Sequence, residues 1–508
     1  MQTSNCVQNL SFNGVSSPVS PSEPLQSIQC SLKSTIHHPK NIRILQFFLC
    51  IIVLCSVMLF QLQNSPFSPA LLDRLLSTIM ALLPAPSEAV AGKVIHAGYR
   101  NLPPDELIDL AIERQITRIV KRSLVGGDES FFIADLGQMV RQHRRWTQNM
   151  PGIRPYYAVK CNCDPTLLKV LAELGTGFDC ASIEEMRAVL NLGVDPARIL
   201  FANPCKAPAA VAFAREVGVL QTTFDNIDEL DTIKTHMPEA QLLLRIYAND
   251  EGAFICLGEK FGAQLDTTEG LLSRAWELGL NVIGVSFHVG TGATNPASFC
   301  KGIKDARLAF SEAERLGFHP KILDIGGGFQ DDCFESMAPI IRDAIRSEFP
   351  AGITTIAEPG RFFARSVYTL ICRVISRRRQ LGNAALSGVP DMLYQNDGIY
   401  GNFMNVIMEK EIMVPYLVKS KKARVLLHKP KSEDALQVTD HRYSIWGPTC
   451  DSTDCVVREV TFDSEVKVGD WLKYKNMGAY TTTTATQFNG FSSTYDTFYV
   501  NSESVSDY

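Results

Sequence analysis

The chain has 508 residues, of which 45% are hydrophobic and 20% are charged, and its formal net charge is −5. This length allows two to four domains, and the small negative charge argues against a nucleic acid as the main partner. The 14 cysteines include no CxxC pair, so we expect reduced thiols and no disulfide framework or metal site.

Residues 1–90 differ in composition from the rest of the chain. Residues 1–40 are rich in Ser, Pro, Asn and Gln, which is typical of disorder. Residues 44–60 are hydrophobic apart from one Gln and one Ser, and are just long enough to span a bilayer. A signal anchor, a targeting presequence and an extension from a misplaced start codon all remain open. We expect a cytoplasmic protein, with membrane attachment through residues 44–60 as the alternative.

The globular part begins at Val94, and its first segment, 94–134, contains a predicted helix at Leu107–Val120 and a predicted strand at Phe131–Asp135. Over residues 135–366, strand-like runs then alternate with amphipathic segments. We predict strands at Tyr156–Lys160, Gly177–Ala181, Arg198–Asn203, Leu220–Asp225, Gln241–Tyr247, Val282–Val289, Ile322–Ile325 and Thr354–Glu358. We predict helices at Asp164–Leu174, Ile183–Leu192, Pro208–Val217, Thr267–Leu278, Ala297–Leu316 and Ala338–Phe349. Eight such strands favour an α/β fold of the (β/α)8 barrel type over a doubly wound open sheet.

Residues 367–508 have a different pattern, in which short β-branched runs recur between turn signals such as Gly469-Asp470 and Asn489-Gly490. We predict an all-β, Greek-key-like second domain that the strand near Phe131 joins. Its predicted strands are Ser366–Ile375, Asp391–Tyr394, Ala423–Leu427, Cys455–Val460, Trp471–Tyr474 and Phe498–Val500.

Polar residues and glycines gather at the C-terminal ends of the predicted barrel strands, where the chemistry of such barrels takes place, and Lys160 occupies the tip of the first strand. They are Lys160, Asp179, Arg245, His288 with Thr291, Gly326-Gly-Gly328, and Glu358-Pro359-Gly360-Arg361. Each alone has an ordinary structural explanation. Together they match the set of groups that a protein needs to bind pyridoxal phosphate. A lysine binds its aldehyde, an imidazole stacks on its ring, glycine N–H groups and an arginine bind phosphate, and a carboxylate holds the ring nitrogen protonated.

Eight motifs together resemble the eukaryotic-type ornithine decarboxylases, which are fold-type III enzymes dependent on pyridoxal phosphate. The resemblance covers roughly residues 94–500. The motifs begin at Pro155, Phe178, Ser286, Asp324, Glu358, Asn396, Trp446 and Met477 and read PYYAVKCN, FDCAS, SFHVG, DIGGGF, EPGR, NDGIYG, WGPTCD and MGAYT.

The resemblance implies a role for each matching residue of the cofactor site. Lys160 is similar to the cofactor-binding lysine, His288 to the stacking residue and Glu358 to the partner of the ring nitrogen. The residues that resemble phosphate ligands are Gly328, Arg361, Tyr480 and Thr291, where the family usually has a serine. Asp179 and Arg245 resemble polar residues near the lysine.

The resemblance also implies a homodimer that decarboxylates L-ornithine to putrescine. Cys450 resembles the acid that protonates Cα, and Asp451 resembles the partner of the distal amine. Both would reach the Lys160 site of the other subunit.

In the expected substrate-binding segment after Tyr400, the chain has Met408-Glu409 where the family usually has Tyr-Asp. Arginine and lysine therefore stay open as alternative substrates. Two further alternatives are a catalytically silent regulator and a diaminopimelate decarboxylase. The regulator is disfavoured because Lys160, His288, Glu358, Cys450 and Asp451 are all present. The diaminopimelate enzymes typically have Cys-Glu where this chain has Cys450-Asp451.

Overall fold

A computed structural model of the chain describes residues 102–122, 129–248, 253, 257–349, 351–418, 441–492 and 494–503. None of the helices in these ranges is both long and apolar enough to cross a membrane. The extension 1–90, with its hydrophobic segment 44–60, lies outside the described residues, and so does the predicted strand at Ala423–Leu427.

Eight parallel strands close into a barrel, which confirms the predicted (β/α)8 fold. They are β2 (Ile153–Ala158), β3 (Gly177–Cys180), β4 (Ile199–Phe201), β5 (Gln221–Phe224), β6 (Gln241–Arg245), β7 (Asn281–Ser286), β8 (Ile322–Asp324) and β9 (Thr354–Ala357). The circle closes through β2, which pairs with β9 on one side and with β3 on the other. All eight strands overlap the predicted ones.

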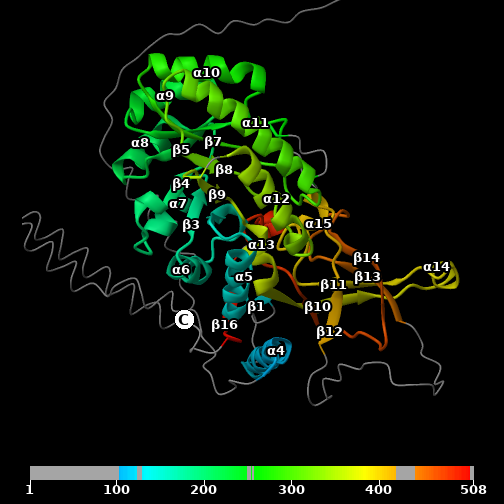
Figure 1. The fold of residues 1–508 in the computed structure, drawn as a ribbon. Coiled ribbons are helices and arrows are strands. Elements are labelled where there is room, and N and C mark those ends of the chain that lie inside the picture. The colour runs from blue at the N-terminus through cyan, green and yellow to red at the C-terminus, as the bar shows by residue number, and fades with distance from the viewer. Residues whose placement is uncertain are drawn as a thin grey trace, which may run out of the picture. The chain divides into compact units, whose positions relative to one another are not determined.

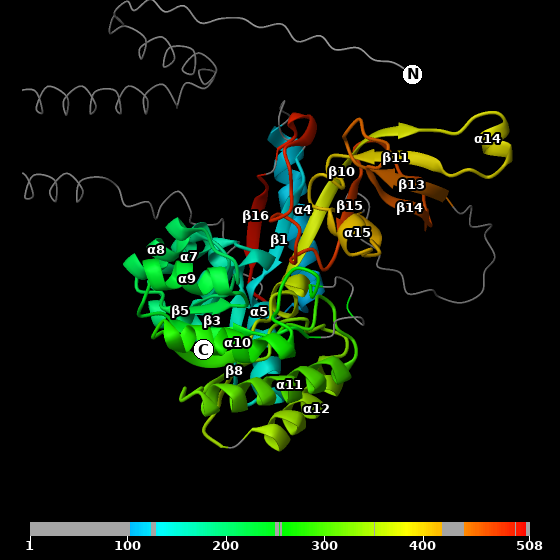
Figure 2. The ribbon, with the colours of Figure 1, turned by 90° about the horizontal axis from the view of Figure 1, so that it is seen from above.

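Helices surround the barrel (Figures 1 and 2). They are α5 (Leu136–Asn149), α6 (Pro165–Glu173), α7 (Ile183–Leu190), α8 (Pro208–Glu216), α9 (Ile227–His236), α10 (Leu265–Glu277), α11 (Pro296–Arg315), α12 (Phe334–Glu348) and α13 (Arg361–Ala364). The sequence patterns did not predict α5, α9 or the single turn α13. Helices α5 and α9 contain few apolar residues, and the buried face of each includes a polar side chain, Gln142 in α5 and Glu229 in α9, so hydropathy alone does not mark them as helices.

The second domain is built on an eight-stranded mixed sheet. Its strands are β1 (Phe131–Asp135), β10 (Tyr368–Arg378), β11 (Asp391–Gln395), β12 (Pro415–Val418), β13 (His441–Trp446), β14 (Cys455–Phe462), β15 (Trp471–Tyr474) and β16 (Asp496–Val500). The short strands β12 and β13 were not predicted. Three more helices accompany the sheet, namely α4 (Pro104–Arg122), α14 (Asn383–Leu386) and α15 (Asn405–Met408).

Strand β1 precedes the barrel in the sequence but belongs to the second domain, as predicted. It pairs antiparallel with β10 and parallel with β16, so it lies between two strands that follow the barrel. All five of its side chains are buried. Its last residue, Asp135, caps helix α5 by accepting a hydrogen bond from the N–H of Gly137 at 3.0 Å.

Hydrogen bonds connect the second domain to the start of the barrel. The side-chain amide of Asn162 donates to the carbonyl of Gly478 at 2.9 Å, and the N–H of Tyr480 donates to the carbonyl of Cys161 at 2.9 Å. These bonds bring the segment around Tyr480 next to the residues that follow β2.

Candidate active site

A pocket lies at the C-terminal ends of the barrel strands, where the sequence predicted the site. Its lining residues are Ala158, Lys160, His288, Thr291, Gly292, Gly328, Phe329, Glu358, Gly360, Arg361 and Tyr480. They come from the ends of β2, β7, β8 and β9 and from the Tyr480 segment of the second domain. The structure therefore brings most of the predicted cofactor residues to one pocket.

Lys160 lies one short turn beyond β2, because the strand ends at Ala158 and Val159–Cys161 form a 3-10 turn. This corrects the prediction that it occupies the tip of the strand. Its side chain is 43% exposed on the pocket wall, and its ammonium contacts the buried carboxylate of Asp179. Burial alone would lower the pKa of Lys160, but the charges of Asp179 and Glu358 outweigh it and raise that pKa.

His288 follows β7 and is neutral. Burial, with the nearby charges of Arg245 and Lys160, lowers its pKa well below the ordinary value. The N–H of Gly290 donates a hydrogen bond to Nδ1 at 3.0 Å, which leaves the proton of the neutral ring on Nε2. A neutral imidazole at the pocket wall suits contact with a flat aromatic ligand.

Glu358, at the end of β9, is buried beside a second acid, Asp324. Burial and then the charge of Asp324 raise the pKa of Glu358 well above its ordinary value. Burial also raises the pKa of Asp324, although its Oδ1 accepts a hydrogen bond from the N–H of Gly326 at 2.9 Å. A cationic or proton-donating ring nitrogen would relieve the cost of ionising Glu358 in this setting.

The loop Gly326-Gly327-Gly328 passes close to the pocket walls, and two of its residues need glycine's conformational freedom, with φ of +65° at Gly326 and +102° at Gly328. At Gly327, a Cβ atom would lie 2.8 Å from Nε2 of His288 and 2.7 Å from the carbonyl oxygen of Glu358. Only a glycine loop therefore lets the backbone approach this closely.

Arg361 supplies a positive charge at the same end of the pocket. Its guanidinium lies over the Tyr480 ring, 5.2 Å from the ring centroid, and its Nε is buried without a hydrogen-bond partner. Thr291 adds a hydroxyl to the lining. A glycine loop, a guanidinium and two hydroxyls suit a phosphate, and the whole pocket fits pyridoxal phosphate.

Three other predicted cofactor residues lie close to the pocket without lining it. Asp179 contacts Lys160, as described above. The carbonyl of Pro359 accepts a hydrogen bond from the N–H of Ala158 at 3.3 Å, so this proline holds the strand ends together. Arg245, at the end of β6, has its guanidinium 5.2 Å from the centre of the Phe261 ring.

Of the residues predicted to bind substrate, Glu409 is the one that reaches the cofactor residues. Its carboxylate forms a buried ion pair with the guanidinium of Arg361. Met408, at the end of α15, is exposed and does not line the pocket. The next acid, Glu411, pairs in the same way with Arg365. The sequence did not predict either ion pair.

Tyr400, Cys450 and Asp451 form a second group on the C-terminal sheet, and none of them lines the Lys160 pocket. The hydroxyl of Tyr400 donates a hydrogen bond to Asp451, while the thiol-bearing residue Cys450 is exposed. The N–H of Cys450 donates to Oδ1 of Asn489 at 3.0 Å, and the Tyr400 ring stacks on Phe488 with centroids 4.4 Å apart. In the sequence, Asn489-Gly490 indicates a turn but predicts neither of these contacts.

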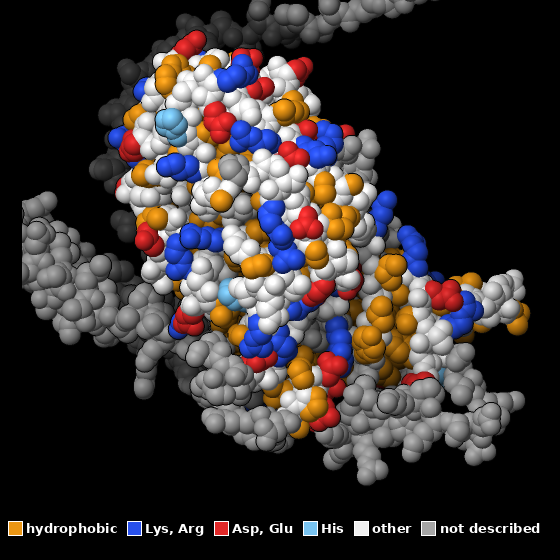
Figure 3. Space-filling view, in the orientation of Figure 1, with side chains coloured by type: hydrophobic (Ala, Val, Ile, Leu, Met, Phe, Trp, Pro, Cys, Tyr) orange, Lys and Arg blue, Asp and Glu red, His pale blue; other side chains and the backbone are white. Residues whose placement is uncertain are grey.

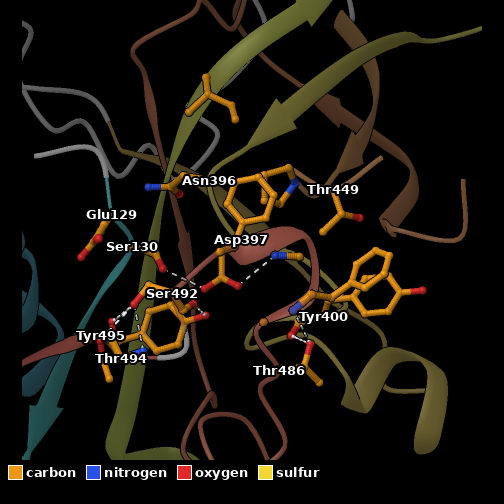
Figure 4. A pocket seen from close by; sticks show the side chains of 16 residues that line it. Glu129, Ser130, Asn396, Asp397, Tyr400, Thr449, Thr486, Ser492, Thr494 and Tyr495 are labelled. Atoms are coloured by element: carbon orange, nitrogen blue, oxygen red, sulfur yellow. Dashed lines mark hydrogen bonds between the residues drawn. The ribbon is translucent and has the colours of Figure 1, made fainter. Parts of the chain in front are cut away.

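A second pocket adjoins this group (Figure 4). Tyr400, Thr449 and Thr486 lie on one side of it, and Ser130 and Tyr495 lie on the other. It shares no lining residue with the Lys160 pocket.

Comparisons with known proteins agree with this geometry. Residues 136–365 match the family described as "Pyridoxal-dependent decarboxylase, pyridoxal binding domain". The chain is 44% identical to the ornithine decarboxylase of Neurospora crassa over 79% of this chain and 87% of the relative. It is 41% identical to that of Saccharomyces cerevisiae, over 77% and 86%. The solved arginine decarboxylase of Paramecium bursaria Chlorella virus is 37% identical, with a TM-score of 0.68 over 76% of this chain and all of that chain.

Proposed function

The chain belongs to the pyridoxal-dependent decarboxylases, so its cofactor is pyridoxal phosphate, and on this premise we propose that it decarboxylates L-ornithine to putrescine. The observation that carries the proposal is the single pocket lined by Lys160, His288, Glu358 and Arg361. The identity of the substrate is supported by the ornithine decarboxylases to which the chain is 40–44% identical.

When bound, pyridoxal phosphate accepts the electron pair that remains at Cα after the carboxylate leaves as CO2. In our proposal Lys160 binds the cofactor covalently and yields this position to the amino group of the substrate. Glu358 holds the proton on the ring nitrogen, and His288 packs its neutral ring against the cofactor.

The phosphate end is proposed to be held by Gly328, Thr291, Arg361 and Tyr480. The backbone of the glycine loop offers N–H donors, and Arg361 offers charge-assisted hydrogen bonds. Because Arg361 already contacts Glu409, the arginine would lie between two anionic groups.

We propose that Cys450 and Asp451 act in the pocket of a second copy of the chain. Both lie outside the pocket of their own barrel, although a proton donor must reach Cα. Large apolar side chains of the same domain are more than half exposed, namely Ile407, Met408, Ile412 and Val414. Figure 3 shows hydrophobic side chains gathered on the surface of the C-terminal sheet. Such a surface suits a homodimer interface.

In this arrangement the Cα–carboxylate bond breaks and CO2 leaves. The thiol of Cys450 then gives its proton to Cα, so that a C–H bond forms and a thiolate remains until solvent reprotonates it. Asp451 pairs with the distal ammonium group, which disfavours amino acids without one.

Arginine is the second candidate substrate, and Glu409 is the observation that favours it. The Glu409 side chain is one methylene longer than the aspartate that the ornithine decarboxylases usually have here, which moves the carboxylate by about 1.5 Å. The similar viral enzyme is described as an arginine decarboxylase.

The decisive experiment measures CO2 release by the purified protein with pyridoxal phosphate, offered ornithine, lysine, arginine and diaminopimelate separately. We expect the largest kcat/KM for ornithine. A preference for arginine or lysine would overturn the proposed substrate and point to Glu409, while a cofactor-loaded protein that releases no CO2 would support the regulator alternative.

A further inference from the structure

The loop that carries Cys450 and Asp451 is held from inside its own domain by Asp454. This buried carboxylate accepts hydrogen bonds from the N–H of Thr449 at 3.0 Å and from its hydroxyl at 2.6 Å. The same carboxylate accepts from the N–H of Ile399 at 2.7 Å. These contacts fix the base of the loop before Cys450 but do not hold Cys450 itself.

Cys450 is held by a different segment, the turn Phe488–Gly490. Within this turn Asn489 has a left-handed backbone, with φ 56° and ψ 14°. In this conformation Oδ1 of Asn489 accepts the hydrogen bond from the N–H of Cys450 at 3.0 Å. Asparagine tolerates the left-handed region better than other residues with a side chain, and here its amide oxygen is also used.

Asp451 is held through Tyr400 by the same turn. The Tyr400 hydroxyl donates to Oδ2 of Asp451, and its ring stacks on Phe488. The hydroxyl of Thr486 donates to the carbonyl of Tyr400 at 3.0 Å, and its N–H donates to the same carbonyl at 2.8 Å (Figure 4). Residues 486–489 therefore contact Cys450 directly and Asp451 through Tyr400, while the other oxygen of the Asp451 carboxylate accepts a hydrogen bond from the N–H of Thr453 at 2.8 Å.

We propose that Asn489 is a positioning residue that aims the thiol of Cys450 at Cα, acting through the Cys450 N–H and not by contact with substrate. This inference rests on the proposed function. In this proposal the two functional residues of the loop are positioned separately. Asn489 positions the proton donor Cys450, and Tyr400 positions the carboxylate of Asp451, which pairs with the distal amine.

The chemical consequence follows from where the proton goes. If Cys450 delivers it to Cα, every CO2 released is matched by one amine product. If the thiol is misplaced, the proton goes to the cofactor carbon instead. Addition of water then releases the product as a carbonyl compound and the cofactor as pyridoxamine phosphate. The ratio of amine to CO2 therefore reports the position of Cys450, while KM reports the contact with Asp451.

The test compares Asn489→Gly, Asn489→Asp and a control, Asn476→Gly, in the full-length protein loaded with pyridoxal phosphate. Glycine keeps the left-handed backbone of residue 489 and removes only the acceptor. Aspartate keeps an acceptor oxygen. Asn476 also has a left-handed backbone, with φ 62°, but lies exposed in the turn after β15.

For Asn489→Gly we expect faster hydrogen exchange at the Cys450 amide and a rise in pyridoxamine phosphate per CO2 of about tenfold to a hundredfold, with KM within about twofold of wild type. Asn489→Asp should restore most of the amine yield, and Asn476→Gly should match wild type. An unchanged exchange rate or an unchanged product ratio in Asn489→Gly would overturn the proposal. If wild type released no CO2, the proposed function would fail, and the exchange rate would still decide whether Asn489 holds the Cys450 amide.

Discussion

The guanidinium of Arg361 and the carboxylate of Glu409 form an ion pair in which both side chains are less than a tenth exposed, 8% and 6% respectively. Burial raises the pKa of Glu409, and the positive charge of Arg361 opposes this shift. The pair joins the Arg361 end of the pocket to the residue that follows α15 of the second domain. Any anion that binds Arg361 must share it with Glu409.

Because Arg361 contacts Glu409 and is also proposed to bind the cofactor phosphate, we predict that cofactor binding depends on the charge of Glu409. A phosphate beside Arg361 would raise the pKa of Glu409 further, so binding takes up a proton and becomes weaker as the pH rises above the ordinary glutamate range. Glu409→Gln should bind the cofactor with a smaller dependence on pH. Equilibrium titration of both proteins with pyridoxal phosphate at several pH values checks this. Parallel pH dependences would contradict it.

A second prediction concerns Lys160. Lys160→Ala should lose both the absorbance band of covalently bound cofactor and CO2 release, because no other lysine lines the pocket among the described residues. Lys169→Ala is the control, since this exposed lysine makes only a surface ion pair with Glu173. A Lys160→Ala protein that still formed the covalent band would show that another lysine binds the aldehyde.

A third prediction tests the shared active site. Lys160→Ala and Cys450→Ala should each be nearly inactive in amine formation. Mixed and allowed to exchange subunits, they should regain about a quarter of wild-type activity, because half the dimers are mixed and each mixed dimer has one intact site. Chromatography with differently tagged subunits verifies the exchange. Mixed dimers without activity would contradict a site that combines Lys160 of one chain with Cys450 of another.

A fourth prediction follows from the buried acids Glu358 and Asp324. Their raised pKa values mean that the folded state keeps their protons to a higher pH than the unfolded state does. Stability of the cofactor-free protein should therefore fall as the pH rises above the ordinary carboxyl range, by up to about 1.4 kcal/mol per pH unit for each proton. Urea unfolding at several pH values should show a flatter decline for Glu358→Gln. Exposed Glu173→Gln should behave like wild type, and equal slopes in all three would argue against the prediction.

The sequence predicted the barrel well because its strands are short, mostly buried and followed by polar or glycine-rich segments, although β5 reads QTTF and has one apolar residue. Apart from Tyr480 of the second domain, the residues that line the pocket lie at or just after the ends of these strands, so the order of the strands brought Lys160, His288 and Glu358 together. Helix α5 was missed because its buried face includes Gln142, whose side-chain amide donates to the carbonyl of Phe362 at 2.6 Å. Hydropathy alone does not identify a buried polar group that is satisfied by a distant carbonyl.

The contacts made by side chains across long separations could not be predicted. Glu409 and Arg361 are 48 residues apart and meet because the residue that follows α15 reaches the first residue of α13. The dipeptide Asn489-Gly490 predicted a turn correctly, but the bond from the Cys450 N–H to Asn489 depends on how two loops of the second domain meet. Sequence patterns indicate which elements form, whereas these pairings follow from tertiary packing.

The place of β1 has a consequence for synthesis of the chain on the ribosome. This wholly buried strand emerges before the barrel, yet its partners β10 and β16 are made after it, and β16 ends only at Val500. At translation rates of about 5–20 residues per second, both edges of β1 remain without a partner strand for tens of seconds. The barrel strands can pair during this interval, whereas the second sheet stays incomplete until its last strand is released. A chain cut short before β16 would expose one edge of β1, and unpaired strand edges favour aggregation.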